Sequence, residues 1–379
     1  MLRVLLACAL LAVATGARAQ SEIRFAQAGE LGAFDPAPAS GPGRPHLWMS
    51  YSSVSDLVVA GVHIAAVSTR LASSPDRGGT WADSGVLLNA AEVEANPPPG
   101  FAGMPAVWQH EVSRIVYDRR ALPAERWKLV WHRYLNVNDG DPATDDRRFA
   151  YSWIGLKAAS SPPGLAAAPE RKLFAGLGYY LAPGITSYND GVGGPPEVRL
   201  DVLDPELGDC LVFTEPGLLA TSKALYASLS CATAQPEARR IVLLKWPYPA
   251  GPWEYRGTLL RAGDAVAIDP GFTSFTASEL AGRGRRTYLI VSPTVQPSDW
   301  YGGCLVFALE DIDRALLRDA DGDGRADVLL RLAGSLGTFS GACGWDRAAR
   351  RSGIIYGEVF PAAVPVFRMF ESDRVPPRR

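Results

Sequence analysis

The stretch CLVFT at Cys210–Thr214 begins a group of four short β-rich runs that decides the fold class. After a turn comes ALYASLS at Ala224–Ser230, then Arg240–Lys245, then Trp253–Leu260. Each run is short for a helix, and turn residues separate it from the next run. Four such strands in succession can pair with one another and close a small antiparallel sheet.

Groups of the same kind fill the chain on both sides. They comprise 46–52, 63–68 and 80–88; 111–117, 127–134, 149–156 and 171–174; 272–278, 286–292, 303–309 and 326–332; and 341–345, 353–359 and 364–370. Repeated four-strand groups fit the blades of a propeller better than the two sheets of a sandwich. We therefore predict an all-β fold, a β-propeller of four-stranded blades, five-bladed by this count with six possible. A strand near Glu22–Phe25 is expected to complete the last group.

Glycine and proline punctuate the chain too often for long helices, and only Asp311–Leu317 looks helical. Three connections between groups are too long to be simple turns: Asp35–Pro45, Ala95–Pro105 and Gly176–Gly208. We expect these loops on one face of the ring, where long loops are often functional. The third loop is rich in residues that suit sugar binding, and a tethered surface loop is the alternative: Tyr179, Tyr180, Tyr188, Asn189 and Asp190.

The first nineteen residues have the pattern of a cleaved secretory signal. Arg3 precedes an apolar run from Val4 to Val13, and small residues follow as far as Ala19. We predict a signal peptide at 1–19 and a single propeller domain at 20–379. The apolar run is shorter than the roughly 20 residues that a membrane span requires. The mature protein is expected to be soluble, and secreted or periplasmic.

The charge balance excludes one class of partner. The chain has 38 basic and 40 acidic residues, a net charge of −2, and loss of Arg3 and Arg18 with the signal leaves 36 against 40, or −4. Nucleic acid and acidic membrane surfaces require a basic patch, so we expect neither as a partner. We expect a monomer.

Four cysteines remain once Cys8 is removed with the signal: Cys210, Cys231, Cys304 and Cys343. An even number in an exported protein favours two disulfides, and four free buried thiols are the alternative. Four cysteines allow three pairings. Cys210 with Cys231 and Cys304 with Cys343 closes the shortest loops and is the favoured pairing.

The stretch SPDRGGTW at 74–81 resembles the Asp-box, Ser-x-Asp-x-Gly-x-Thr-Trp, of sialidases and related propellers. Asp76 can accept turn N–H groups, Gly78 tolerates positive φ, and Trp81 can bury its ring beneath the hairpin. In that family the hairpin joins the outer strands of a blade, away from the active site. The resemblance therefore implies a fold and leaves catalysis open.

An acidic loop follows the third strand of the fourth group. Asp319, Asp321, Asp323 and Asp327 occupy its first, third, fifth and ninth positions, with a glycine at the sixth. The spacing resembles the calcium loops of thrombospondin-type and FG-GAP repeats, and differs from an EF-hand because Leu330 stands at the twelfth position. We predict a structural Ca²⁺ here, with a solvated acidic hairpin as the alternative.

The sequence lacks several common catalytic motifs. His110-Glu111 has no second histidine at zinc-protease spacing, and there is no Gly-x-Ser-x-Gly elbow and no phosphate-binding glycine loop with lysine. The remaining candidates for catalytic groups are carboxylates. The candidates near the ends of predicted inner strands are Glu111, Glu215 and Glu279, with Glu358 also considered. Two carboxylates across a funnel are what glycoside hydrolysis requires, and a structural salt bridge is the alternative role of each.

True sialidases add three arginines, a tyrosine nucleophile with its glutamate partner, an aspartate, and an Arg-Ile-Pro motif that reads Arg114-Ile115-Val116 here. The resemblance therefore supplies no catalytic set. The five-blade count is also similar to that of arabinanase- and fructosidase-type glycosidases, which implies acidic residues on separate inner strands, such as Glu111 and Glu279.

Aromatic side chains complete the predicted site, with Trp48, Trp108 and Trp345 stacking against sugar rings and Tyr301 as a further substrate-binding candidate. We predict a carbohydrate-active propeller with a carbohydrate or glycoconjugate ligand, and a glycoside hydrolase of the sialidase or arabinanase/fructosidase type as its most specific form. A non-catalytic propeller that binds glycan or protein is the alternative, and a structural scaffold is a third.

Overall fold

The computed structural model describes residues 21–42, 46–90, 104–137, 151–181, 192–295, 300–333, 338–360 and 365–377. The predicted signal at 1–19 lies outside the described residues, as do most of the loop at 95–105 and the part of the third loop that carries Tyr188, Asn189 and Asp190. No helix in the described part of the chain is long and apolar enough to cross a membrane.

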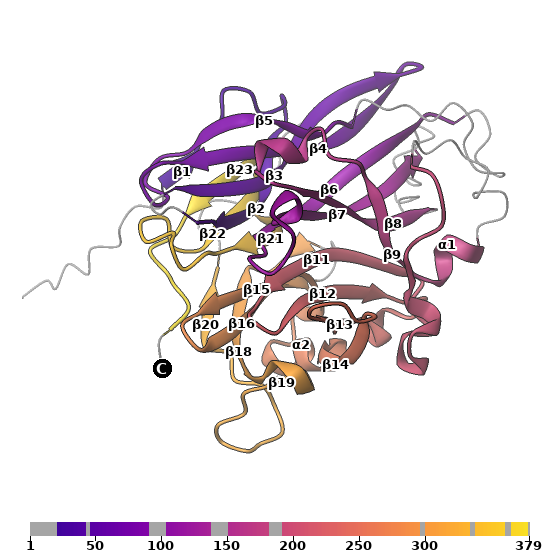
Figure 1. Ribbon diagram of the computed structural model, residues 1–379, viewed down its shortest axis with the longest axis vertical. Helices are drawn as coiled ribbons and strands as arrows, with labels where there is room; N and C mark the ends of the chain where they lie inside the picture. Colours follow the sequence, from indigo (N-terminus) through magenta and orange to yellow (C-terminus); the bar gives the residue numbers. More distant parts are fainter. Residues whose placement is uncertain are drawn as a thin grey trace, which may run out of the picture.

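The described strands form five blades around a common centre, as the sequence predicted. In Figure 1 the innermost strands β2, β6, β11, β15 and β21 gather in the middle of the molecule. Blade 1 comprises β2 (Gly32–Ser40), β3 (Leu47–Val59), β4 (Val62–Ser74) and β5 (Ala82–Leu88). Blade 2 comprises β6 (Ala106–Tyr117), β7 (Trp127–Val137), β8 (Ser152–Ala159) and β9 (Arg171–Ala175), with the short β10 (Val198–Arg199) beside β9.

The chain continues around the ring in the same order. Blade 3 comprises β11 (Val212–Ala220), β12 (Ala224–Ala232), β13 (Arg240–Pro247) and β14 (Glu254–Arg261). Blade 4 comprises β15 (Phe272–Arg283), β16 (Arg286–Val295), β18 (Cys304–Asp311) and the short strands β17 (Trp300–Tyr301), β19 (Leu316–Leu317) and β20 (Leu330–Leu332). Blade 5 comprises β21 (Thr338–Gly344), β22 (Ile355–Phe360), β23 (Val366–Glu371) and β1 (Ser21–Ile23).

The N-terminal strand closes the ring. Strand β1 pairs antiparallel with β23, with Ser21 opposite Glu371, so the first and last described strands lie in one blade (Figure 1). This pairing confirms the predicted join. Because both chain ends are held in the same small sheet, the ring cannot open without breaking that sheet.

Hydrophobic clusters fill the spaces between neighbouring blades, and each of the five interfaces has at least one cluster. Their fully buried members include Leu129 between blades 1 and 2, Ile154 between 2 and 3, Leu289 between 3 and 4, Ile290 between 4 and 5, and Met49 between 5 and 1. Each blade is therefore apolar on both faces. This burial leaves the strand ends and the channel as places for polar chemistry.

Blade 1 differs from the prediction at its innermost strand. Residues 32–40 form β2, although the sequence indicated a loop over Asp35–Pro45. Pro36 and Pro38 disfavour a regular strand, but the pairing of β2 with β3 shifts register between Phe34 and Ala37. A β-bulge accommodates proline, so residues 32–40 still form a strand.

Helices are few among the described residues: α1 (Leu177–Leu181) and α2 (Ala262–Ile268). Neither was predicted, because both are too short to show a helical pattern of apolar residues. The predicted helix at Asp311–Leu317 is a single 3-10 turn at Ile312–Arg314, followed by β19.

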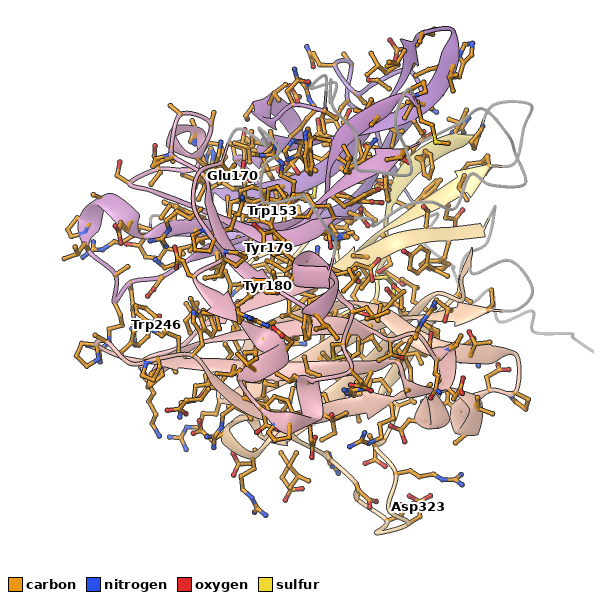
Figure 2. The ribbon with its side chains drawn as sticks, turned by 90° about the vertical axis from the view of Figure 1, so that its right-hand side faces the viewer. Trp153, Glu170, Tyr179, Tyr180, Trp246 and Asp323 are labelled. Carbon is orange, nitrogen blue, oxygen red and sulfur yellow. A yellow bond between two sulfur atoms is a disulfide. The ribbon has the colours of Figure 1, made fainter. Side chains whose placement is uncertain are left out.

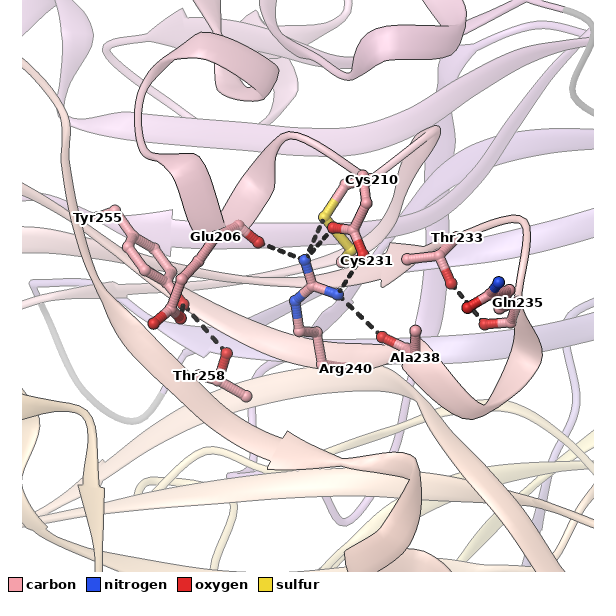
Figure 3. Close-up of a disulfide and its surroundings, with 10 residues drawn as sticks. Glu206, Cys210, Cys231, Thr233, Gln235, Ala238, Arg240, Tyr255 and Thr258 are labelled. Atoms are coloured by element: carbon pink, nitrogen blue, oxygen red, sulfur yellow. Dashed lines mark hydrogen bonds and ion pairs between the residues drawn. A yellow bond between two sulfur atoms is a disulfide. The ribbon is translucent and has the colours of Figure 1, made fainter.

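Both favoured disulfides are present, which confirms the pairing. Cys210–Cys231 closes the start of blade 3, and Figure 3 shows the Arg240 guanidinium against it. That guanidinium donates to the backbone oxygen of Ala238 at 2.9 Å and pairs with Asp209. Cys304–Cys343 joins β18 to β21 and thus blade 4 to blade 5.

The turn at 74–80 has the hydrogen bonds that the Asp-box resemblance implies. Asp76 Oδ1 accepts the amide protons of Gly79 and Thr80, at 3.0 and 2.9 Å, and the Ser74 hydroxyl accepts that of Gly78 at 2.8 Å. The turn joins β4 to β5, the two outer strands of blade 1. It therefore lies away from the channel, and membership of the sialidase family stays a prediction.

Candidate active site

Every innermost strand carries a β-bulge at a corresponding point. The bulged residues have left-handed φ angles: Asp35 (53°), Val112 (47°), Glu215 (52°), Ala277 (46°) and Gly341 (70°). A residue with a side chain adopts this conformation at a cost on the order of 1 kcal/mol. Four such residues in one ring indicate that the ring has a function beyond holding the blades together.

The bulges direct backbone amides towards carboxyl groups of the neighbouring blade. Ala342, just after the bulge of blade 5, donates its N–H to Asp35 Oδ1 at 2.6 Å. Ala277, in the bulge of blade 4, donates to the carboxylate of Glu215 in blade 3. The Ser52 hydroxyl holds the second oxygen of Asp35 at 2.8 Å. Both carboxyl groups are therefore fixed in orientation.

Asp35 is fully buried and packs directly on the backbone of blade 5. A Cβ atom placed on Gly341 would lie 1.9 Å from Asp35 Oδ1. Gly341 also has the left-handed φ angle that glycine tolerates best. Glycine is thus required at this point for two reasons, close approach and backbone conformation.

Two tyrosines donate hydrogen bonds to carboxyl groups at this end of the channel. Tyr301 donates its hydroxyl to Glu215 Oε1 at 2.9 Å, and Tyr134 donates to Glu111 Oε2 at 2.6 Å. Glu111 lies on β6 next to the bulge, and it is less buried than Asp35 or Glu215. We call Asp35, Glu111 and Glu215 the carboxyl cluster.

The charges within the carboxyl cluster interact. Burial raises the pKa of Glu215 to about 7, and the charge of Glu111 adds to the rise while the hydrogen bonds from Ala277 and Tyr301 oppose it. Burial, then the charge of Glu111, raises the pKa of Asp35 well above its usual value, against the hydrogen bonds that it accepts. Such groups titrate as a unit, so the cluster keeps at least one proton near neutral pH.

Burial and then the charges of Glu215, Glu111 and Asp35 raise the pKa of Tyr301 well above 10. The Tyr301 phenol therefore stays protonated as a donor. A carboxyl cluster that holds both a proton and a negative charge can give a proton to one atom and take a proton from another, which is general acid and base chemistry.

The structure brings three of the sequence-predicted residues together, namely Glu111, Glu215 and Tyr301. Glu279 lies beyond the bulge of β15, where its carboxylate oxygens accept the backbone N–H of Trp345 at 3.2 and 3.3 Å. Trp345 is buried between blades 4 and 5. Glu358 lies on β22, one strand away from the channel. These residues are thus separate from the carboxyl cluster.

The other two predicted aromatic residues lie in the packing between or within blades. Trp48 is partly buried between blades 1 and 2, next to His46 at 4.9 Å between ring centroids. Trp108 is buried in blade 2 at 5.4 Å from Trp153, a residue labelled in Figure 2. Their role in sugar binding stays a prediction.

Three of the four predicted calcium ligands lie close together. Carboxylate oxygens of Asp319, Asp321 and Asp327 are within 4.8 Å of one another, and Asp323 is not part of that group. Figure 2 shows Asp323 at the tip of its loop, on the outside of the molecule. The loop can hold a cation through these oxygens, but it is remote from the labelled residues of blade 2. Calcium binding stays a prediction.

Sequence reasoning missed Asp35 and Tyr134. A signal for Asp35 was present, because Asp35-Pro36 and Glu215-Pro216 are both an acidic residue followed by proline, and both occupy the bulge of an innermost strand. Tyr134 had no comparable signal, since it lies on the second strand of blade 2 and reaches the channel only through its hydroxyl.

No family model and no curated protein matches this chain. Among solved structures, Zg3597, a family 117 glycoside hydrolase from the marine bacterium Zobellia galactanivorans, is 12% identical, with a TM-score of 0.50 over 93% of this chain and 89% of that chain. A thermostable family-43 glycoside hydrolase is 10% identical, with a TM-score of 0.48 over 91% and 90%.

The Bombyx mori family 32 β-fructofuranosidase is 14% identical, with a TM-score of 0.45 over 87% of this chain and 55% of that chain, so this protein spans little more than half of it. All three neighbours are named as glycoside hydrolases, and the likeness to the family 117 enzyme supports the all-β propeller fold. Identities this low show the fold alone. The narrower resemblance to sialidases stays a prediction.

Proposed function

We propose that the protein is a glycoside hydrolase that works at the carboxyl cluster. The observation that carries the proposal is the convergence of Asp35, Glu111 and Glu215 from the inner strands of three consecutive blades. Two of them occupy bulges whose backbone conformation is costly, and costly conformations are common at functional sites. Hydrolysis of a glycoside requires one carboxyl group as acid and another as base or nucleophile.

Glu215 is the proposed acid. Its pKa of about 7 keeps it largely protonated between pH 4.5 and about 7, where a free glutamic acid is ionised. Tyr301 and the Ala277 amide hold it in place. It can therefore deliver its proton to the oxygen of the leaving group.

Asp35 is the proposed base or nucleophile. It comes from the innermost strand of blade 1, and Glu215 comes from the innermost strand of blade 3. Both of its oxygens accept hydrogen bonds, which oppose the rise in its pKa caused by burial and by Glu111. The proposal places the proton of the carboxyl cluster on Glu215 and the negative charge on Asp35. Glu111 is the proposed positioning residue, because its charge raises the pKa of Glu215 and so keeps the acid protonated.

The solved structures of similar fold include enzymes named as xylosidase, α-L-arabinofuranosidase and endo-arabinase as well as β-fructofuranosidase. We propose that the substrate is a glycan released outside the cytoplasm. The predicted signal and the two disulfides support that location.

A panel of aryl glycosides tests the proposal, with xylosides, arabinofuranosides, fructosides and sialosides included. Wild-type protein is compared with Asp35→Asn and Glu215→Gln, and Glu279→Gln serves as a matched buried control outside the cluster. Turnover that disappears in the first two variants and persists in the third supports hydrolysis. Absence of turnover on every substrate would favour the non-catalytic binding propeller.

A further inference from the structure

A cavity of about 660 Å³ lies at the C-terminal ends of the innermost strands. Its wall begins just past the bulges, with Arg114 in β6 and Glu279 in β15, and includes residues from all five blades. None of the residues of the carboxyl cluster lines it. The ring of bulges therefore divides the channel, with the carboxyl cluster on one side and this cavity on the other.

The wall of the cavity is strongly basic, in a chain whose net charge is −2. It carries five arginines against two acidic residues: Arg114, Arg119, Arg285, Arg286 and Arg347 against Glu279 and Asp346. In the described part of the chain, none of these five guanidinium groups forms a salt bridge. We call this space the arginine cavity.

Arg114 is the buried member of the set, with 3% of its surface exposed. Its Nη1 donates to the backbone oxygen of Ser113 at 3.1 Å, while Nε and Nη2 have no hydrogen-bond partner among the described residues. Buried donors in proteins are almost always paired. By contrast, Arg70 makes two hydrogen bonds to Asp83, at 2.9 and 2.8 Å. Arg114 therefore brings a positive charge to the inner wall of the cavity, and no described acceptor is hydrogen-bonded to its Nε and Nη2.

The acidic residues of the wall do not supply that acceptor. Glu279 faces the cavity from blade 4, but no described hydrogen bond or ion pair joins it to Arg114, and it accepts the Trp345 amide instead. Burial raises the pKa of Glu279 to about 8, although Arg114 opposes the rise, so its negative charge is largely absent at neutral pH. Asp346 already accepts hydrogen bonds from Ser40 and Ala348.

We propose that the arginine cavity is a second binding site, which takes a small molecule bearing a carboxylate or phosphate group. Two adjacent N–H donors of a guanidinium match the two oxygens of such a group. The cavity has the size of known small-molecule sites, which hold about 300 to 1,000 Å³. Exposed Arg347 binds the oxyanion at the mouth, and the positive charge of buried Arg114 attracts it towards the inner end. This proposal does not rest on the proposed hydrolysis.

Isothermal titration calorimetry at pH 7 tests the proposal with three probes: D-galacturonate, D-galactose and inorganic phosphate. The two sugars differ only in a carboxylate against a hydroxymethyl group. Galacturonate or phosphate should bind and galactose should not, and the probe that binds identifies the source of the oxyanion. Equal binding of both sugars, or binding of none of the three probes, would overturn the proposal.

Variants locate the binding. Arg114→Gln should weaken it by about tenfold, since a positive charge at the inner wall of the cavity is lost. Arg347→Ala should weaken it by a smaller factor, and keeps the test valid if Arg114→Gln does not fold. Arg350→Ala is the matched control, an exposed arginine of the same loop that does not line the cavity. Binding that survives both cavity variants would place the anion elsewhere.

Discussion

The two ends of the central channel are built from the same five strands and have opposite chemistry. On one side of the bulges, Asp35 and Glu215 hold carboxyl groups against backbone amides. On the other side, buried Arg114 and four exposed arginines line a cavity. Val112, in the bulge of β6, and Arg114 are only two positions apart in the sequence. A bulge thus lets one strand serve two different sites, because it resets which side chains face the channel.

The bulge of blade 5 should matter most to the carboxyl side. In Gly341→Ala the new methyl group would occupy the place of Asp35 Oδ1, so we expect Asp35 to shift and hydrolysis to fall by about a hundredfold or more. Gly61→Ala is the matched control, since Gly61 also has a positive φ angle (84°) but has no atom within 4 Å of the added carbon. Comparable kinetics in the two variants would show that the contact with Asp35 is unimportant.

The pH dependence of hydrolysis should report Glu215. Because the acid must be protonated, kcat/KM should fall about tenfold per pH unit above the Glu215 pKa of about 7. The residual activity of Glu215→Gln should lack this alkaline limb. A wild-type profile that stays level to pH 9 would contradict the assignment of Glu215 as the acid.

On the other side of the bulges, Glu279 should affect stability rather than catalysis. Its pKa is about 8 in the folded protein and near 4.5 in the unfolded chain, so the folded state binds more protons between these values. Stability from this group is present below pH 4.5 and is lost as the pH rises to 8. Glu279→Gln should therefore melt at the wild-type temperature near pH 5 and a few degrees higher at pH 9. The reverse order at pH 9 would show that ionised Glu279 is stabilised.

The acidic loop on the outside of blade 4 should have the smallest effect. If Ca²⁺ binds Asp319, Asp321 and Asp327, chelation should lower the melting temperature slightly, because the loop is exposed and few contacts depend on it. Asp321→Ala should abolish that response and leave hydrolysis unchanged. An identical melting temperature with and without chelator would contradict the predicted calcium site.

The sequence was sufficient to predict the blades, because β-rich runs and turns recur within each blade and both are local sequence patterns. It was also sufficient for the two disulfides and for the strand that closes blade 5. It failed at β2, where Pro36 and Pro38 looked like a loop and the bulge that accommodates them depends on pairing with β3. That single error hid Asp35 from the predicted site.

The site itself depends on contacts between distant parts of the chain. Glu111 and Glu215 were identified from their places near strand ends, but their partners Tyr134 and Tyr301 come from second strands or short connecting strands. Glu279 also lies on an innermost strand, β15, but on the other side of the bulge of that strand. A difference of two or three positions along an innermost strand decides which end of the channel a side chain lies at. No local sequence pattern indicates that difference.

The central claim is that Glu215 gives a proton to the leaving group and Asp35 acts on the sugar. The dependence of the hydrolysis rate on the leaving group tests this claim most directly. Wild-type, Glu215→Gln and Asp35→Asn are assayed on paired aryl glycosides, one with a leaving group that needs protonation and one with a dinitrophenolate that does not. We predict that Glu215→Gln loses activity about 10² to 10⁴-fold on the first and keeps most of it on the second, while Asp35→Asn loses both. Equal losses on both substrates in Glu215→Gln would contradict the account.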